Sequence, residues 1–301
     1  MTGETSSFSL PGFRVGHWTH ESGQTGCSVV IPDEPALAVV DVRGGAPGTR
    51  ETSLLEEGRM VQRVNAVLLT GGSAFGLSAA DGVVRWLREQ RRGFPTASIP
   101  VPIVSAAVLF DLKGDDPVWP NAQAGYECAA GATEDQWVSG RRGAGTGATV
   151  AKILNHQGRP SGIGAARIET EAGTVAALMA VNAVGEIATA ETDDGRTLEQ
   201  TILSGVDPQP RTGENTTIGV VAIDGALERD DLVRIAVAAH DGLARAIHPA
   251  HTIFDGDTIF VLCRHDGTLR PRDSLILNVA TQHAVMRAII NATNTSTAQE
   301  R

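Results

Sequence analysis

Short apolar runs separated by polar turns dominate the chain. The runs are rich in Val, Ile and Leu, and Gly, Pro or Asp bound them, which is typical of buried β-strands. They span residues 27–31, 37–42, 66–69, 103–110, 174–183, 218–223 and 258–263. Two segments instead repeat apolar residues at helical spacing, one from Leu77 to about Arg92 and one from Asp230 to Ile247. The pattern predicts a mixed α/β fold.

Two segments are mostly polar. The first runs from Ile187 to Asn215, contains two prolines and has only one short apolar patch, at Ile202 and Leu203. We expect it to be exposed and mobile, so that a break at its downstream end would disturb little structure. The second is the tail over 291–301, which we expect to be frayed.

Composition narrows the class of protein. With 301 residues and 42% apolar content, the chain can bury a substantial core as a single domain over 1–301. The net charge of −10 and the lack of a basic run interleaved with aromatics argue against nucleic acid and anionic membranes as partners. Three widely spaced cysteines suggest neither a disulfide framework nor a cysteine zinc site. Because the first residues lack the basic start and apolar run of a signal peptide, we expect a cytoplasmic protein.

The step from Asn215 to Thr216 is the most informative feature, because a long polar loop ends there and a β-branched strand begins. If this bond breaks, Thr216 gains an α-amine beside its hydroxyl, and that amine can take the hydroxyl proton. Its reference pKa of about 7.7 to 8.0 leaves a useful neutral fraction near pH 7. Asn-Thr-Thr also fits the acceptor pattern for N-glycosylation, and Asn is common where loops end.

Lysine is rare in this chain. Of its 25 basic residues only Lys113 and Lys152 are lysines, the rest being arginine. A codon bias toward arginine explains the trend, but an amine whose pKa can shift is useful where a proton must move, and guanidinium does not offer one. Lys152 follows a glycine-rich segment over 143–148 and is the candidate, whereas Lys113 lies in a Gly-Asp-Asp turn. The glycine-rich segment matches no nucleotide-binding pattern and indicates close backbone approach.

One loop and one amide side chain could stabilise negative charge. Gly71, Gly72 and Ser73 follow a strand and precede a helix, where backbone N–H groups favour an anion or a developing oxyanion, although an ordinary turn has the same composition. Asn182 interrupts an apolar run, so its amide either clasps a neighbouring backbone or serves as an oxyanion donor.

Acidic residues and histidines gather between 248 and 257. Asp255 and Asp257 flank one glycine just before a buried strand. With His248 and His251 they could hold a cation, but the spacing matches no established zinc pattern, and Asp-Gly also marks tight turns.

Taken together, the chain resembles the self-processing amidases that include the DmpA-type aminopeptidases, the β-peptidyl aminopeptidases and the nylon-oligomer hydrolases. The resemblance spans nearly the whole chain and rests on several motifs in the family's order. They are DVRGGAPGTRET (41–52), LLTGGSAFGL (68–77), GAGTGATVAK (143–152), AVNAVG (180–185), NTTIGVVA (215–222) and HTIFDGDT (251–258).

The resemblance implies the α-β-β-α layered sandwich of the DmpA and ornithine acetyltransferase superfamily. It implies an α fragment over 1–215 and a β fragment over 216–301, with no metal or other cofactor, and homo-oligomers such as a tetramer of αβ units. By the resemblance, the site residues are the nucleophile Thr216, the catalytic lysine Lys152, the polarising amide Asn182, and the paired carboxylates Asp255 and Asp257.

The implied activity is hydrolysis of amide bonds in small peptides, β-peptides or ω-amino acid oligomers. An acyltransferase of the same superfamily, or an unprocessed binding protein that has lost activity, are the alternatives. Phe110 stands where the nylon-oligomer hydrolases are expected to carry a tyrosine, so a hydroxyl contact in the substrate pocket is missing and substrate preference does not carry over.

Overall fold

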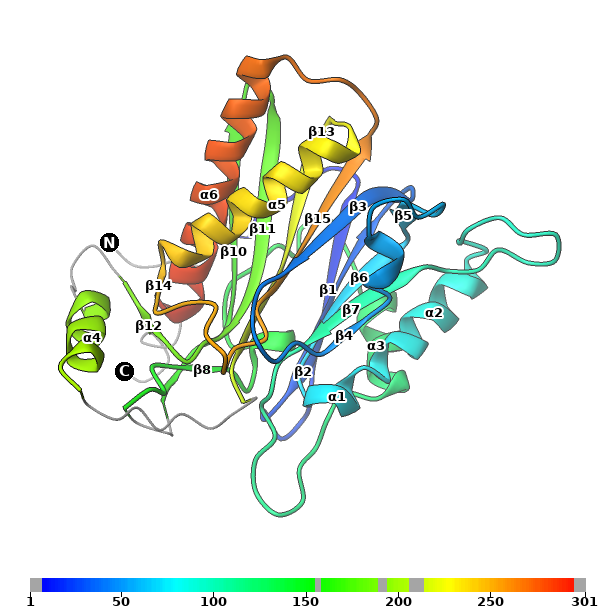
Figure 1. Ribbon diagram of the computed structural model, residues 1–301. Helices are drawn as coiled ribbons and strands as arrows, with labels where there is room; N and C mark the ends of the chain where they lie inside the picture. Colours follow the sequence, from blue (N-terminus) through cyan, green and yellow to red (C-terminus); the bar gives the residue numbers. More distant parts are fainter. Residues whose placement is uncertain (1–6, 155–157, 189–193, 206–213, 295–301) are drawn as a thin grey trace.

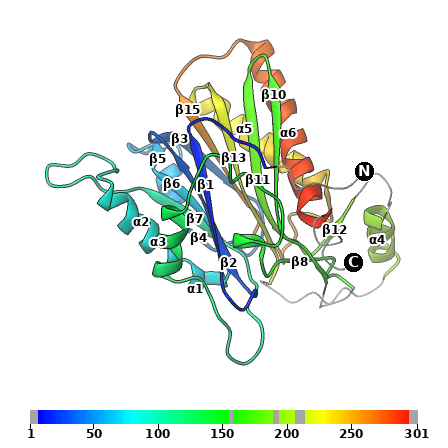
Figure 2. The same ribbon diagram turned by 180° about the vertical axis from the view of Figure 1, so that it is seen from behind.

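The computed structural model describes residues 7–154, 158–188, 194–205 and 214–294 of the chain. Two large β-sheets lie against each other, and helices cover the outer face of each (Figure 1; Figure 2 gives the view from behind). This order of layers confirms the predicted α-β-β-α sandwich.

The first sheet has the strand order β1 (Phe13–Thr19), β2 (Gly26–Pro32), β6 (Ala66–Thr70), β7 (Val104–Val108) and β4 (Thr49–Arg50). The second has the order β10 (Ile163–Thr170), β11 (Gly173–Asn182), β13 (Thr216–Ala226), β15 (Thr258–His265), β3 (Ala36–Val42) and β5 (Arg63–Val64). Two short pairs join β8 (Thr149–Val150) to β9 (Arg159–Pro160), and β12 (Glu186–Ile187) to β14 (Ile247–His248).

The helices are α1 (Ser73–Gly76), α2 (Ala79–Glu89), α3 (Ala122–Ala130), α4 (Asp194–Leu203), α5 (Arg229–Ala244) and α6 (Pro271–Asn294), with 3-10 turns at Ser53–Leu55 and Gly143–Gly145. None of the helices in the described part of the chain is long and apolar enough to cross a membrane.

Three apolar clusters hold these layers together. One lies between the sheets, a second joins the first sheet to α2 and α3, and a third joins the second sheet to α5 and α6. Strand β13 shows how alternation builds them, since Ile218 and Val220 face the other sheet whereas Val221 and Ile223 face the helices. Strands buried on both faces explain why the sequence shows continuous apolar runs.

Strand β13 lies inside the second sheet, antiparallel to β11 and parallel to β15. Its register places Thr216 opposite Asn182, the last residue of β11. On its other side Ile218 lies opposite Thr258, the first residue of β15. The end of β11, the start of β13 and the loop before β15 therefore meet at one edge of the sheet.

The apolar runs located their strands correctly, but β1, β10, α3 and α6 were not predicted. Helix α6 was missed because its sheet-facing side repeats a small residue, alanine, at 280, 284, 288 and 292, which gives a weak apolar signal. The helix predicted from Leu77 to about Arg92 is α2, which begins two residues later and ends three residues earlier, and the short helix α1 just before it was not predicted.

The polar segments are more ordered than predicted where the structure describes them. Helix α4 occupies part of the segment between Ile187 and Asn215 and packs on β12 and β14, so that part is not an irregular loop. Residues 189–193 and 206–213 of that segment lie outside the described residues. In the tail, 291–294 belong to α6, and 295–301 lie outside the described residues.

Strand β10 packs so closely on α6 that Gly164 has no room for a side chain. A Cβ added there would lie 1.8 Å from the Ala288 carbonyl oxygen. We predict that Gly164→Ala lowers the free energy of unfolding by about 2 kcal/mol or more, the range of an overpacked core. The control is Gly225→Ala, whose added Cβ would meet its nearest atom at 3.4 Å. Urea denaturation measures both, and equal stability of the two variants would contradict this packing.

Candidate active site

Thr216 begins β13 and is buried, with 4% of its surface exposed. Its Oγ1 donates a hydrogen bond to the carbonyl oxygen of Asn215, the residue before it. The same carbonyl accepts the backbone N–H of Gly256 at 3.0 Å. A hydroxyl and a backbone donor thus converge on the carbonyl of the Asn215–Thr216 bond, where the sequence predicts cleavage.

Lys152 follows β8 and points its ammonium at the same place. Its Nζ donates to Asn182 Oδ1 at 2.9 Å, to the Asn182 carbonyl at 3.1 Å and to the Glu214 carbonyl at 3.3 Å. Burial lowers the pKa of Lys152 to about 7, against the opposing charges of Asp255 and Glu214. A lysine with that pKa can give or take a proton near neutral pH.

Asn182 forms the predicted clasp, because its amide holds backbone groups on two sides. Its Nδ2 donates to the carbonyls of Phe110 and Glu214, each at 3.0 Å. Its Oδ1 accepts the Thr149 N–H at 3.0 Å as well as the ammonium of Lys152. Every hydrogen-bonding position of the amide is used, but one partner, Glu214, lies just upstream of the Asn215–Thr216 bond. Departure of that segment would free one amide N–H.

The two carboxylates hold different parts of the site. Asp255 accepts the Thr252 N–H at 3.0 Å, the Thr252 hydroxyl at 2.6 Å and the Val184 N–H at 3.3 Å. Burial, followed by the charge of Asp257, raises the pKa of Asp255 to about 6. Asp257 accepts the N–H of Thr217 at 2.8 Å, which fixes the backbone directly after the candidate nucleophile.

His251 supports Asp257 from the other side, a role that the sequence did not predict. The second oxygen of Asp257 lies 2.8 Å from His251 Nδ1 and accepts the His251 backbone N–H at 3.1 Å. The His251 ring contacts the edge of His240, with centroids 4.8 Å apart. Burial lowers the pKa of His240 to about 4, so this ring packs there without a charge.

The alternative metal site is not assembled. His248 Nδ1 lies 3.4 Å from a carboxylate oxygen of Glu199. Among the residues that the structure describes, no group of three or more His, Cys, Asp or Glu side chains could hold a metal ion.

The loop Gly71 to Ser73 is not supported as a source of oxyanion donors. Its three successive N–H groups donate to the Gly26 carbonyl at 2.9 Å, an Asp111 carboxylate oxygen at 2.7 Å and the Leu109 carbonyl at 2.9 Å. The backbone N–H that donates to the Asn215 carbonyl is instead that of Gly256, which stands in the sequence as part of an ordinary Asp-Gly-Asp turn.

The remaining observations concern Phe110, the glycine-rich segment over 143–148 and Lys113. Phe110 contributes its carbonyl, which accepts from Asn182, while its side chain is half-buried. The glycine-rich segment does allow close backbone approach, because a Cβ on Gly145 would lie 2.0 Å from the Ile163 nitrogen. Lys113, the other lysine, is exposed and donates to the Gly147 carbonyl at 3.1 Å.

Comparison with known proteins finds one matching family and several similar sequences. The model of peptidase family S58 matches residues 9–301. An uncharacterized aminopeptidase of Mycobacterium leprae is 40% identical over 283 residues, which cover 84% of this chain and 76% of the relative. A 6-aminohexanoate-oligomer endohydrolase of Kocuria sp. is 30% identical over 278 residues, which cover 86% of this chain and 75% of the relative.

Solved structures show the same fold. The L-aminopeptidase D-Ala-esterase/amidase of Ochrobactrum anthropi, described as a variant of the Ntn-hydrolase fold, superposes with a TM-score of 0.74 at 19% identity, covering 97% of this chain and 87% of that one. A Burkholderia sp. β-aminopeptidase superposes with a TM-score of 0.73 at 22% identity and the same coverage.

The buried lysine predicts a pH dependence of stability. The pKa of Lys152 is about 7 in the folded chain, against 10.5 for a lysine in its ordinary state in water. Between these pH values the unfolded chain holds a proton that the native state lacks, so the free energy of unfolding rises with pH. We compare Thr216→Ala protein with the double variant that carries Thr216→Ala and Lys152→Met. Between about pH 7 and pH 9, the free energy of unfolding of Thr216→Ala protein should rise relative to that of the double variant. Urea denaturation across this range measures the difference, and parallel pH profiles would contradict the lowered pKa.

Proposed function

The chain belongs to peptidase family S58 and is a hydrolase of amide bonds, and on this premise we propose that it cuts its own Asn215–Thr216 bond and then uses Thr216 as an N-terminal nucleophile. The observation that carries the proposal is the convergence on one carbonyl. The Thr216 hydroxyl and the Gly256 N–H both contact the Asn215 oxygen, and Lys152 and Asn182 hold the neighbouring Glu214 carbonyl.

Self-cleavage begins when Thr216 Oγ1 attacks the carbonyl carbon of Asn215. The Gly256 N–H stabilises the oxyanion, the carbon–nitrogen bond to Thr216 breaks, and the nitrogen takes the hydroxyl proton. The product is an ester between the Asn215 carbonyl and Thr216 Oγ1. Water then hydrolyses this ester, which leaves a carboxylate on Asn215 and both a free hydroxyl and a free α-amine on Thr216.

Turnover of an external amide uses the same atoms. The α-amine of Thr216 takes the hydroxyl proton as Oγ1 attacks the substrate carbonyl, and the protonated amine passes that proton to the departing substrate amine. Water releases the acyl group in the second step. The Asn182 amide N–H, freed from Glu214, donates to the oxyanion, a contact whose loss costs roughly a hundredfold or more in rate.

The surrounding charges prepare the new amine. Asp257 holds the backbone at Thr217, and Asp255 contributes negative charge, which tends to raise the amine pKa. Lys152 acts in the opposite direction when it is protonated, and its own pKa of about 7 lets its charge vary near neutral pH. We propose small peptides, β-peptides or ω-amino acid oligomers as substrates, a range that includes the substrate class in the name of the Kocuria relative.

Removing the hydroxyl tests the nucleophile. We predict that Thr216→Ala leaves one intact chain and lowers amide turnover by about a thousandfold or more, because the hydroxyl that attacks the carbonyl is removed. Thr216→Ser keeps a hydroxyl at the same atom and is expected to cleave and to turn over substrate. Denaturing gels and an assay on aminoacyl amides, β-amino amides and linear oligoamides measure both variants. A fully active Thr216→Ala protein would remove the mechanism.

Crowding the backbone donor tests the role of Gly256. A Cβ added there would lie 2.8 Å from Thr216 Oγ1 and 2.6 Å from the Ala46 carbonyl, so the loop must shift away from the reacting carbonyl. We predict that Gly256→Ala slows self-cleavage about tenfold or more, as expected for a displaced oxyanion donor. Gly225→Ala, on the far end of β13, is the matched control. Densitometry of the two fragments during expression and storage gives the rates, and unchanged cleavage in Gly256→Ala would exclude this donor.

A further inference from the structure

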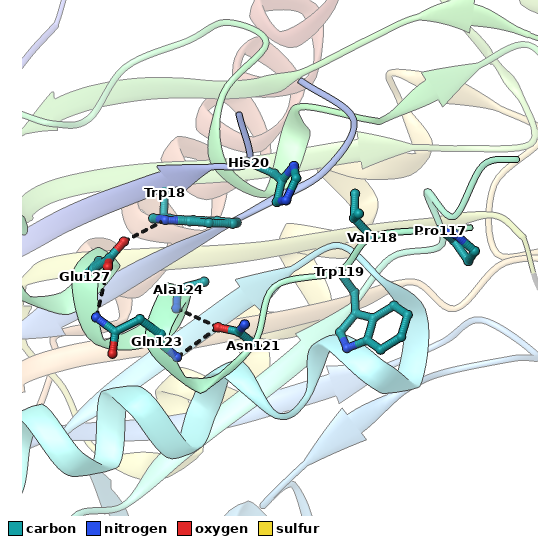
Figure 3. A pocket seen from close by; sticks show the side chains of 9 residues that line it. All are labelled: Trp18, His20, Pro117, Val118, Trp119, Asn121, Gln123, Ala124 and Glu127. Carbon is teal, nitrogen blue, oxygen red and sulfur yellow. Dashed lines mark hydrogen bonds between the residues drawn. The ribbon is translucent and has the colours of Figure 1, made fainter. Parts of the chain in front are cut away.

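An open surface cavity lies between the end of β1, the segment 117–121 and the start of α3, and its lining includes none of the residues of the Thr216 site (Figure 3). Its volume is about 610 Å³. The side chains that define its chemistry are Trp18, His20, Trp119, Asn121, Gln123 and Glu127. Two of the four tryptophans of the chain therefore line one cavity, in a protein with only 4% aromatic residues.

Aromatic side chains form part of the cavity wall. Trp18 and His20 meet edge to face, with ring centroids 5.8 Å apart. Trp119 stacks on Phe75 at 4.8 Å, although 38% of Trp119 and 59% of Phe75 are exposed. Of this pair, Trp119 lines the cavity, and its exposed part is an apolar surface against which an alkyl chain could pack.

One oriented carboxylate gives the cavity its charge. Glu127 accepts Trp18 Nε1–H at 2.9 Å on one oxygen and Gln123 Nε2–H at 2.9 Å on the other. Both donors are uncharged, so they orient the carboxylate without neutralising it. No lysine or arginine lines the cavity, and none forms an ion pair with Glu127 among the described residues.

From these features we propose that the cavity binds a primary alkylammonium ion. The ammonium would contact the Glu127 carboxylate and the ring face of Trp18, which attract a cation by charge and by the ring quadrupole. The alkyl chain would lie against Trp119. The same carboxylate repels an anion of equal length, and a neutral alcohol gains only the apolar contact.

The cavity wall is built on the loop that the sequence singled out for the active site. A Cβ on Gly72 would lie 2.4 Å from Trp119 Cβ, so Trp119 packs directly on this glycine. The Gly72 N–H is held by Asp111, whose neighbour Phe110 accepts the amide of Asn182 through its carbonyl. The segment from Phe110 to Trp119 therefore contacts both the Asn182 amide and the wall of the cavity. Amide hydrolysis releases an amine, so a product of the proposed reaction belongs to the class of ligand that this cavity would bind. Only this link rests on the proposed function.

Calorimetric titration of the Thr216→Ala protein with n-hexylammonium, n-hexanol and hexanoate tests the site directly. These probes have equal chain length and no amide bond, so their binding does not depend on turnover or on cleavage. We expect saturable binding of n-hexylammonium, at least tenfold weaker binding of n-hexanol, and no binding of hexanoate. Absence of saturable n-hexylammonium binding, or equal binding of n-hexanol, would overturn the proposal and leave the proposed function untouched.

Variants locate the binding. Glu127→Gln keeps the shape of the side chain and removes its charge, and we expect it to weaken n-hexylammonium binding at least tenfold. Trp119→Ala should weaken it by a similar factor. The matched control is Glu57→Gln, which removes the same charge from an exposed residue elsewhere and should leave binding unchanged. Native circular dichroism spectra establish that each variant folds, and unchanged binding in a folded Glu127→Gln protein would contradict the site.

Discussion

The pairing of β13 with its two neighbours is the constraint on which the site depends. Backbone hydrogen bonds to β11 set Thr216 opposite Asn182, and bonds to β15 set the Asp255–Asp257 loop beside the same strand end. Because the side chains of a strand alternate between its faces, a slip by one residue would turn the Thr216 hydroxyl to the opposite face. Apolar clusters on both faces of the second sheet prevent that slip. The position of the Thr216 hydroxyl is thus fixed by the apolar core on both faces of the sheet.

Burial shifts the pKa values of polar groups in the site, and the fold tolerates their burial because each group is hydrogen-bonded. Lys152, Asn182, Asp255 and Asp257 are all buried, where an unpaired polar group would cost several kcal/mol. Each finds backbone or side-chain partners instead, many of them at strand ends, where the sheet leaves backbone groups unpaired. The same burial moves the pKa values of Lys152 and Asp255 toward neutrality, so that protons can move between these groups near pH 7.

The sequence predicted those parts of the fold whose residues carry a strong apolar signal. Strand β13 was located because six β-branched or small apolar residues follow one another after a polar loop. Helix α6 was missed, since alanines against a sheet look neutral. In the site, Thr216, Lys152 and the aspartates stood out by type and position, and the structure brings them together. Gly256 and His251 did not stand out, because a backbone donor and a supporting ring become visible only when distant segments meet.

The central claim is that the active protein contains a free α-amine on Thr216. Intact mass measurement and N-terminal sequencing of a fully active preparation test it most directly. The account predicts two chains that stay associated, the shorter one beginning Thr-Thr-Ile-Gly. Full activity in a preparation that contains only the uncut chain of 301 residues would contradict it.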